Sequence, residues 1–222
     1  ASYYVKSFDM DNAELAYGRK EDLSLKKIGL QLDSIYYCGR DIRANIEEFV
    51  FKERSGLELV STEGRIASDS VLIQIPKFTM KTTASSLDLQ TKIGWDVLEM
   101  KKTGVLSAKI NAEIGKGDVA KILGGRDTLF LQTYPNKPFV FRADAEGDLN
   151  RLRLRTLEAG LAKAFELKAE GNLLHLTDST RRGGEIHLAA ETYDMRFLRP
   201  LTDGHFALRR GTSLKGIFTM AG

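Results

Sequence analysis

The 222-residue chain lacks several features that would assign it to a class of protein directly. It has one cysteine, Cys38, so it cannot form an internal disulfide, and its cysteine content does not indicate an oxidising or a reducing compartment. It contains no run approaching the ~18 apolar residues that a membrane-spanning helix needs. Its beginning, at Ala1-Ser2-Tyr3-Tyr4, has no basic and apolar signal region.

The chain also lacks a large excess of charge of either sign. The 33 basic and 30 acidic residues leave a net charge of +3, and no five-residue window is uniformly basic, so no nucleic-acid footprint is apparent. The three histidines, His175, His187 and His205, are not at the spacing of a metal-binding pair. Glu185 and His187 share a strand face as an acid–base pair would, but so does any solvated face. We therefore expect no enzyme, no metal and no cofactor.

What the chain does have is alternation of apolar and polar side chains, most regular from Val71 to Lys92. Successive side chains of a strand point to opposite faces, so this pattern predicts a sheet with one apolar and one polar face. Strands are predicted at about 2–9, 23–36, 46–53, 57–67, 70–82, 85–97, 104–114, 138–148, 150–157, 161–171, 184–192 and 212–219.

Only two short helices are predicted. Asp118 precedes one apolar turn that ends before Gly124, and Asp194 precedes a second turn that Pro200 would stop. Neither is long enough to be stable alone in water, so each is expected to dock on the sheet.

The spacing of these features suggests an internal repeat of roughly eighty residues. Glycine turns are predicted at Gly64, Gly147 and Gly171, and the aspartates that would cap the helices are Asp118 and Asp194. The expected organisation is the end of a preceding repeat over 1–45, one unit over 46–125 and a second unit over 126–222, with one continuous sheet as the alternative.

A meander of this kind fits an elongated antiparallel sheet, which must twist and curl. The fold class predicted is therefore mainly β, with the sheet curled into an open trough or into a sandwich filled by its own side chains.

The order of several segments resembles the TamB and AsmA-like family of bacterial envelope proteins. The segments are Phe49–Leu57, then Glu63-Gly64, the alternating strand to Phe78, Thr82-Thr83-Ala84-Ser85-Ser86-Leu87, and Ala112–Gly115 with Asp118 and Leu123. The resemblance is best from about Ile46 to Gly171, and its most specific part is Phe51–Leu57.

The resemblance implies a curled sheet, often called a β-taco, that faces the periplasm and is anchored to the inner membrane through a region absent here. The family is associated with outer-membrane assembly and with movement of phospholipid between the two membranes. The implied partners are phospholipid acyl chains and, through missing regions, an outer-membrane barrel protein.

If the trough is open, acyl chains would lie on its apolar row. The candidate residues are Val71, Ile73, Ile75, Phe78, Met80, Leu87, Leu89, Ile93, Ile110, Phe139, Phe141, Phe165 and Leu167. The alternative function is a chaperone-like module that binds barrel strands at a sheet edge by β-augmentation. Pro76, Pro135 and Pro138 each lack a backbone donor and are poor residues for an edge that recruits strands, which favours lipid.

Overall fold

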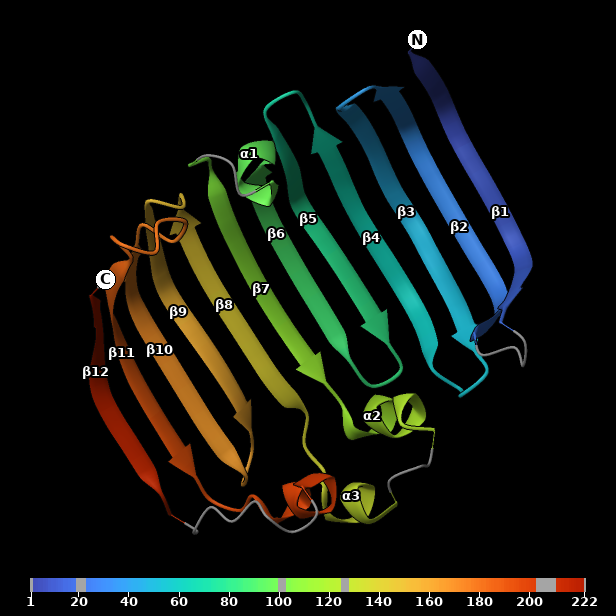
Figure 1. Ribbon diagram of the computed structural model, residues 1–222. Helices are drawn as coiled ribbons and strands as arrows, with labels where there is room; N and C mark the ends of the chain where they lie inside the picture. Colours follow the sequence, from blue (N-terminus) through green and yellow to red (C-terminus); the bar gives the residue numbers. More distant parts are fainter. Residues whose placement is uncertain (1, 19–22, 100–102, 125–127, 203–210, 222) are drawn as a thin grey trace.

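A computed structural model describes residues 2–18, 23–99, 103–124, 128–202 and 211–221. It confirms the predicted fold class, because the described strands form one antiparallel sheet of twelve in which each strand pairs with its neighbours in sequence (Figure 1). The strands are β1 (Tyr3–Tyr17), β2 (Leu23–Cys38), β3 (Asp41–Glu53), β4 (Glu58–Ser68), β5 (Leu72–Thr82), β6 (Ser86–Gly94), β7 (Leu106–Ile114), β8 (Phe139–Gly147), β9 (Arg151–Leu161), β10 (Phe165–Leu174), β11 (Gly183–Thr192) and β12 (Ser213–Ala221).

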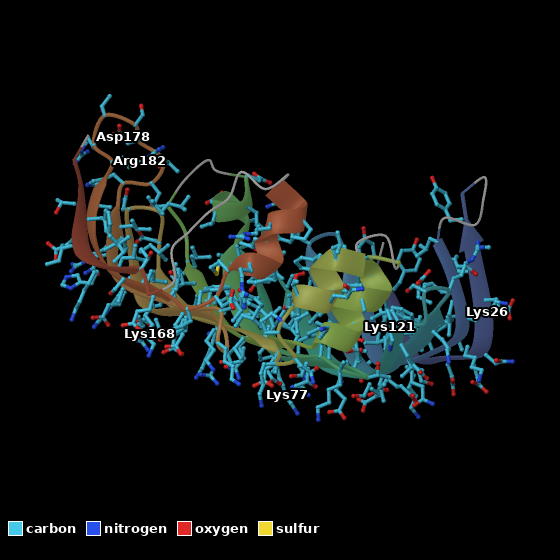
Figure 2. All side chains as sticks on the ribbon, turned by 90° about the horizontal axis from the view of Figure 1, so that it is seen from below. Lys26, Lys77, Lys121, Lys168, Asp178 and Arg182 are labelled. Atoms are coloured by element: carbon cyan, nitrogen blue, oxygen red, sulfur yellow. The ribbon has the colours of Figure 1, made fainter. Side chains whose placement is uncertain are left out.

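The sheet curls without closing. In Figure 2, which looks from below, β1 and β12 rise on the same side and the sheet between them forms a trough. Within the described residues, β1 pairs only with β2 and β12 pairs only with β11. The sheet is therefore an open trough and not a closed sandwich.

The helices of the described part are short. They are α1 (Trp95–Leu98), α2 (Lys116–Ile122), α3 (Thr128–Thr133) and the 3-10 helix η1 (Arg196–Thr202). The two predicted helices correspond to α2 and η1, whereas α1 and α3 were not predicted.

Two details of the predicted helices are wrong. The N-cap of α2 is Gly115, and Asp118 lies inside the first turn. η1 contains Pro200 instead of ending at it. The predicted cap of the second helix is present, because the backbone N–H of Arg196 donates to Asp194 Oδ1 at 3.2 Å.

Bulges keep the apolar residues on one face where simple alternation would move them to the other. In β5 the register shifts between Ile75 and Phe78, which are three positions apart, so that Ile75 lies opposite Thr91 and Phe78 opposite Leu89. Pro76 lies in this bulge, where its missing N–H removes no ladder bond. A second bulge in β9 places Leu154 and Leu157 on the same face.

The predicted glycine turns are wrong in position. Gly64 lies within β4 and Gly171 within β10, while Gly147 is the last residue of β8. Gly64 is opposite Phe78, and a Cβ there would lie 2.7 Å from the Phe78 ring. Glycine at this position accommodates an aromatic ring and does not reverse the chain.

The strand order also bears on the expected repeats. The sheet runs through them without interruption, and position 45, the expected end of the first repeat, lies inside β3. The expected boundary at 125/126 lies outside the described residues.

Gly115 provides a test of how α2 is seated. A Cβ at Gly115 would lie 2.2 Å from the Ala84 carbonyl oxygen, in the turn between β5 and β6. Because a backbone atom cannot move aside cheaply, we expect Gly115→Ala to lower the free energy of unfolding by about 1–3 kcal/mol. Chemical denaturation followed by circular dichroism measures this change.

Gly117→Ala is the matched control. Its Cβ would make only an ordinary contact, 3.4 Å from Ala84 Cβ, and alanine favours the helix by up to about 1 kcal/mol. Equal stability of the two variants would contradict the close seating of α2.

Candidate functional site

The inner, concave face of the trough is apolar across the whole sheet. One row of directly opposed positions crosses all twelve strands, and each position holds an apolar side chain or glycine. The row is Phe8, Leu32, Ile46, Gly64, Phe78, Leu89, Ile110, Ala143, Leu157, Ala169, Leu188 and Gly216. The concave face is therefore apolar along this row on every strand, with a few hydroxyl side chains such as Thr62 and Thr91 at other positions of the same face.

The structure brings twelve of the thirteen candidate residues together on this face. Ile73, Ile75, Phe78, Met80, Leu87, Leu89, Ile93, Ile110, Phe139, Phe141, Phe165 and Leu167 share it through the strand register, and all twelve are half-buried. Val71 does not join them, because it lies in the turn before β5 and is 66% exposed.

The outer, convex face carries the charged side chains. Lys77 and Lys168 project from it in Figure 2. Opposite charges pair across neighbouring strands, as in Arg142 Nη1 to Glu158 Oε2 at 3.3 Å and Lys77 Nζ to Glu63 Oε2 at 3.9 Å. Exposed pairs of this kind contribute at most ~1 kcal/mol each, so the convex face is mainly a solvated surface.

One end of the concave face is covered by α2, α3 and η1, which we call the helical plug (Figure 1). Phe130 of α3 and Tyr134, which directly follows α3, pack with Phe197 of η1, with ring centroids 5.3–5.9 Å apart. This cluster is buried together with Leu161 and Ala164, and burial raises the pKa of the Tyr134 phenol.

The plug contacts part of the predicted groove. Phe139 and Phe165 pack against its aromatic cluster, as do Val119 and Leu123 from and after α2. These two candidate groove residues therefore belong to a packed core. Among the described residues, none of the candidates on β5 and β6 is part of that core.

Asp118 fastens α2 to the sheet. It is 2% exposed, and its carboxylate accepts hydrogen bonds from the hydroxyls of Thr82 and Ser85, the latter at 2.6 Å. Burial by itself raises the pKa of Asp118, but the bonds from Ser85 and Thr82 and the charge of Lys121 together lower it below its ordinary value. The ionised carboxylate is therefore the form that holds the plug.

Beside α2, over β2 to β5, the concave face is hollowed instead of filled. The hollow has a volume of about 480 Å³, and no polar atom is exposed on its wall. It is lined by Leu30, Ile46, Phe49, Phe51, Leu57, Leu59, Thr62, Phe78, Met80 and Thr82. The Thr62 hydroxyl is buried and has no hydrogen-bond partner in the described part of the chain.

The polar groups considered as catalytic candidates lie apart from this face. His187 contacts Glu185 at 2.8 Å on the solvated side of β11, His175 follows β10 in a turn, and His205 lies outside the described residues. Among the residues that the structure describes, no three His, Cys, Asp or Glu side chains are grouped as metal ligands. None of the described helices is long and apolar enough to cross a bilayer.

Comparison with known proteins gives no match, whether to a family model, to a curated protein or to a solved structure.

The sequence predicts two helices of the plug, α2 and η1, as helices docked on the sheet, but not α3 or the hollow. Only half of the six residues of α3 are apolar, and so short a pattern does not distinguish a helix from a strand or a loop. Phe49, Phe51 and Leu57 were noted in the resembling segment but not as groove residues, although the spacing of Ile46, Phe49 and Phe51 matches the bulged spacing of β5.

The role of Asp118 is testable by substitution. Asp118→Asn removes the charge that accepts the Ser85 and Thr82 hydrogen bonds, and bonds to charged groups contribute about 1.5–3 kcal/mol. We expect the free energy of unfolding at neutral pH to fall by that amount. Asp88→Asn on the exposed convex face is the control and should change it by less than about 0.5 kcal/mol.

The difference between wild type and Asp118→Asn should depend on pH. Because the folded-state pKa is lowered, the stabilisation is fully present above the ordinary aspartate pKa of ~3.9 and is lost as pH falls through the folded value. Urea titrations between about pH 7 and pH 2 measure the difference, and a gap that stays constant over this range would rule out ionised Asp118 as the fastening group.

Proposed function

We propose that this chain is a periplasmic conduit segment that carries phospholipid acyl chains along its concave face, in a protein anchored to the inner membrane. The observation that supports this most is the continuous apolar face of the open trough, half-buried on β5 and β6 while charged side chains lie on the other face. A soluble protein rarely leaves a contiguous apolar surface without an occupant.

The energetics are sufficient for such a role. Each buried methylene contributes ~0.8 kcal/mol, so an acyl chain of about sixteen carbons that lies fully against the face recovers on the order of 10 kcal/mol. The charged head group would remain outside, since no charged side chain is among the directly opposed positions of the central row. The resemblance to TamB and AsmA-like proteins agrees with this proposal.

The test places a photo-crosslinking amino acid at Ile73 or Leu89 on the concave face, with Gln74 or Gln90, their neighbours on the other face, as matched controls. We expect phospholipid adducts, identified in cells by mass spectrometry, at the two concave positions and none at the controls. Equal labelling of both faces, or no lipid at either, would exclude carriage along this face.

A second function, chaperoning of outer-membrane proteins, is supported by the edges of the sheet. Pro76 lies in the interior strand β5 and Pro135 and Pro138 lie between α3 and β8, so the proline argument against edge pairing was wrong. β1 and β12 contain no proline and expose large apolar side chains, including Phe8 and Phe218. Such edges are templates for an added strand.

Crosslinkers at Phe8 and Phe218 separate the two functions. Chaperoning predicts adducts with outer-membrane proteins at these edge positions and none at Leu89, whereas carriage predicts lipid at Leu89 and at Phe8, which lies in the same row, and no protein adducts at either. Mass spectrometry of both sets in the same cells decides between them, and edge positions without protein adducts would count against chaperoning.

A further inference from the structure

The concave face is not uniform along the strand order. At one end of β8 to β10 the aromatic cluster of the helical plug fills it, whereas at β2 to β5 it opens into the 480 Å³ hollow. An apolar chain that moves along the face would therefore meet a filled region on one side and an empty one on the other.

The wall of the hollow restricts what it can hold. It exposes no polar atom. Thr62 lies in the wall, but its hydroxyl oxygen is buried and is not exposed to the hollow. A polar ligand would lose its bonds to water here and gain none, which is costly. The occupant that fits this chemistry is plain hydrocarbon.

The volume restricts the size of the occupant. At about 480 Å³ the hollow lies in the lower part of the range of small-ligand pockets, roughly 300–1,000 Å³. That is room for one acyl chain and not for a whole phospholipid molecule.

We propose that the β2–β5 hollow is a binding site for a single acyl chain, so that lipid rests here by one chain while any second chain lies elsewhere on the concave face. This inference rests on the proposed function of that face. The concave face would then have one defined resting place for lipid.

The first test is a chain-length series of saturated fatty acids from octanoate to stearate, with binding to the purified protein measured by calorimetry and stoichiometry by native mass spectrometry. Each added methylene should tighten binding roughly fourfold until the hollow is filled near palmitate, and then add little. One chain should be retained per protein. A gain that continues at the same rate through stearate, or several chains of equal affinity, would overturn the proposal.

Two variants change the hollow in opposite directions. Leu30→Trp on β2 fills it and should weaken palmitate binding at least tenfold, whereas Phe51→Ala on β3 enlarges it and should move the plateau to longer chains. Leu152→Trp is the matched control, because Leu152 is a half-buried concave residue of β9 outside the hollow. Circular dichroism checks that each variant is folded, and an unchanged plateau in Phe51→Ala would refute the site.

Further experiments distinguish a free fatty acid, a phospholipid chain and a protein segment as the occupant of the hollow. Lysophosphatidylcholine should displace palmitate from the site. A crosslinker at Leu30 should capture dipalmitoylphosphatidylcholine from vesicles through one of its two chains. Crosslinks from Leu30 to a second copy of the protein, or to another segment of it, would show a protein occupant and overturn the proposal.

Failure of the site and failure of the function give different results. If Leu30→Trp and Leu152→Trp weaken palmitate binding equally while lipid still crosslinks at Leu89, the face carries lipid without a defined resting place. If no acyl chain binds and no lipid is captured at Leu89, the proposed function itself fails.

Discussion

The structure depends on one constraint, which is that a single face of the sheet stays apolar through twelve consecutive strands. A side chain that moved to the wrong face would expose hydrocarbon on the convex side and place a charge in the trough. Strict alternation is broken where two apolar residues of a strand are three positions apart, and there a bulge corrects the phase. At Pro76 in β5 and near Arg155 in β9, one extra residue restores the face and adds local twist, which also helps the sheet to curl.

A curled sheet with an apolar inner face still needs something to cover that face. In the described residues the helical plug covers one end, and α1, with Val97 buried, lies at β6 near the other end (Figure 1). The plug helices are too short to be stable without their contacts. Phe130, Tyr134 and Phe197 provide the apolar contact, and Asp118 provides the polar one. Between these helices the apolar side chains of β5 and β6 stay half-buried instead of forming a closed core.

The strands and the apolar face could be predicted because both follow from local alternation, which each strand carries in its own sequence. The three-residue spacing from Ile75 to Phe78 is also visible there and signals a bulge. What could not be predicted depends on contacts between distant segments. Asp118 reads as a helix cap until the β5–β6 turn brings Ser85 to it, and Gly64 reads as a turn until Phe78 is placed opposite it. The plug and the hollow follow from such contacts.

The difference between the filled and hollow parts of the face has a physical consequence for movement of an apolar chain. On a uniform surface a chain gains the same free energy at every position, so nothing opposes sliding and nothing makes a chain pause. A hollow that surrounds a chain removes more of its surface from water than a flat wall does, so the free energy is lowest there. The Asp118-fastened plug lies beside that minimum, where α2 borders the β5–β6 turn. A chain that leaves the hollow toward β8 finds the plug end of the face already filled by Phe130 and its neighbours, so less of the face is open to it there.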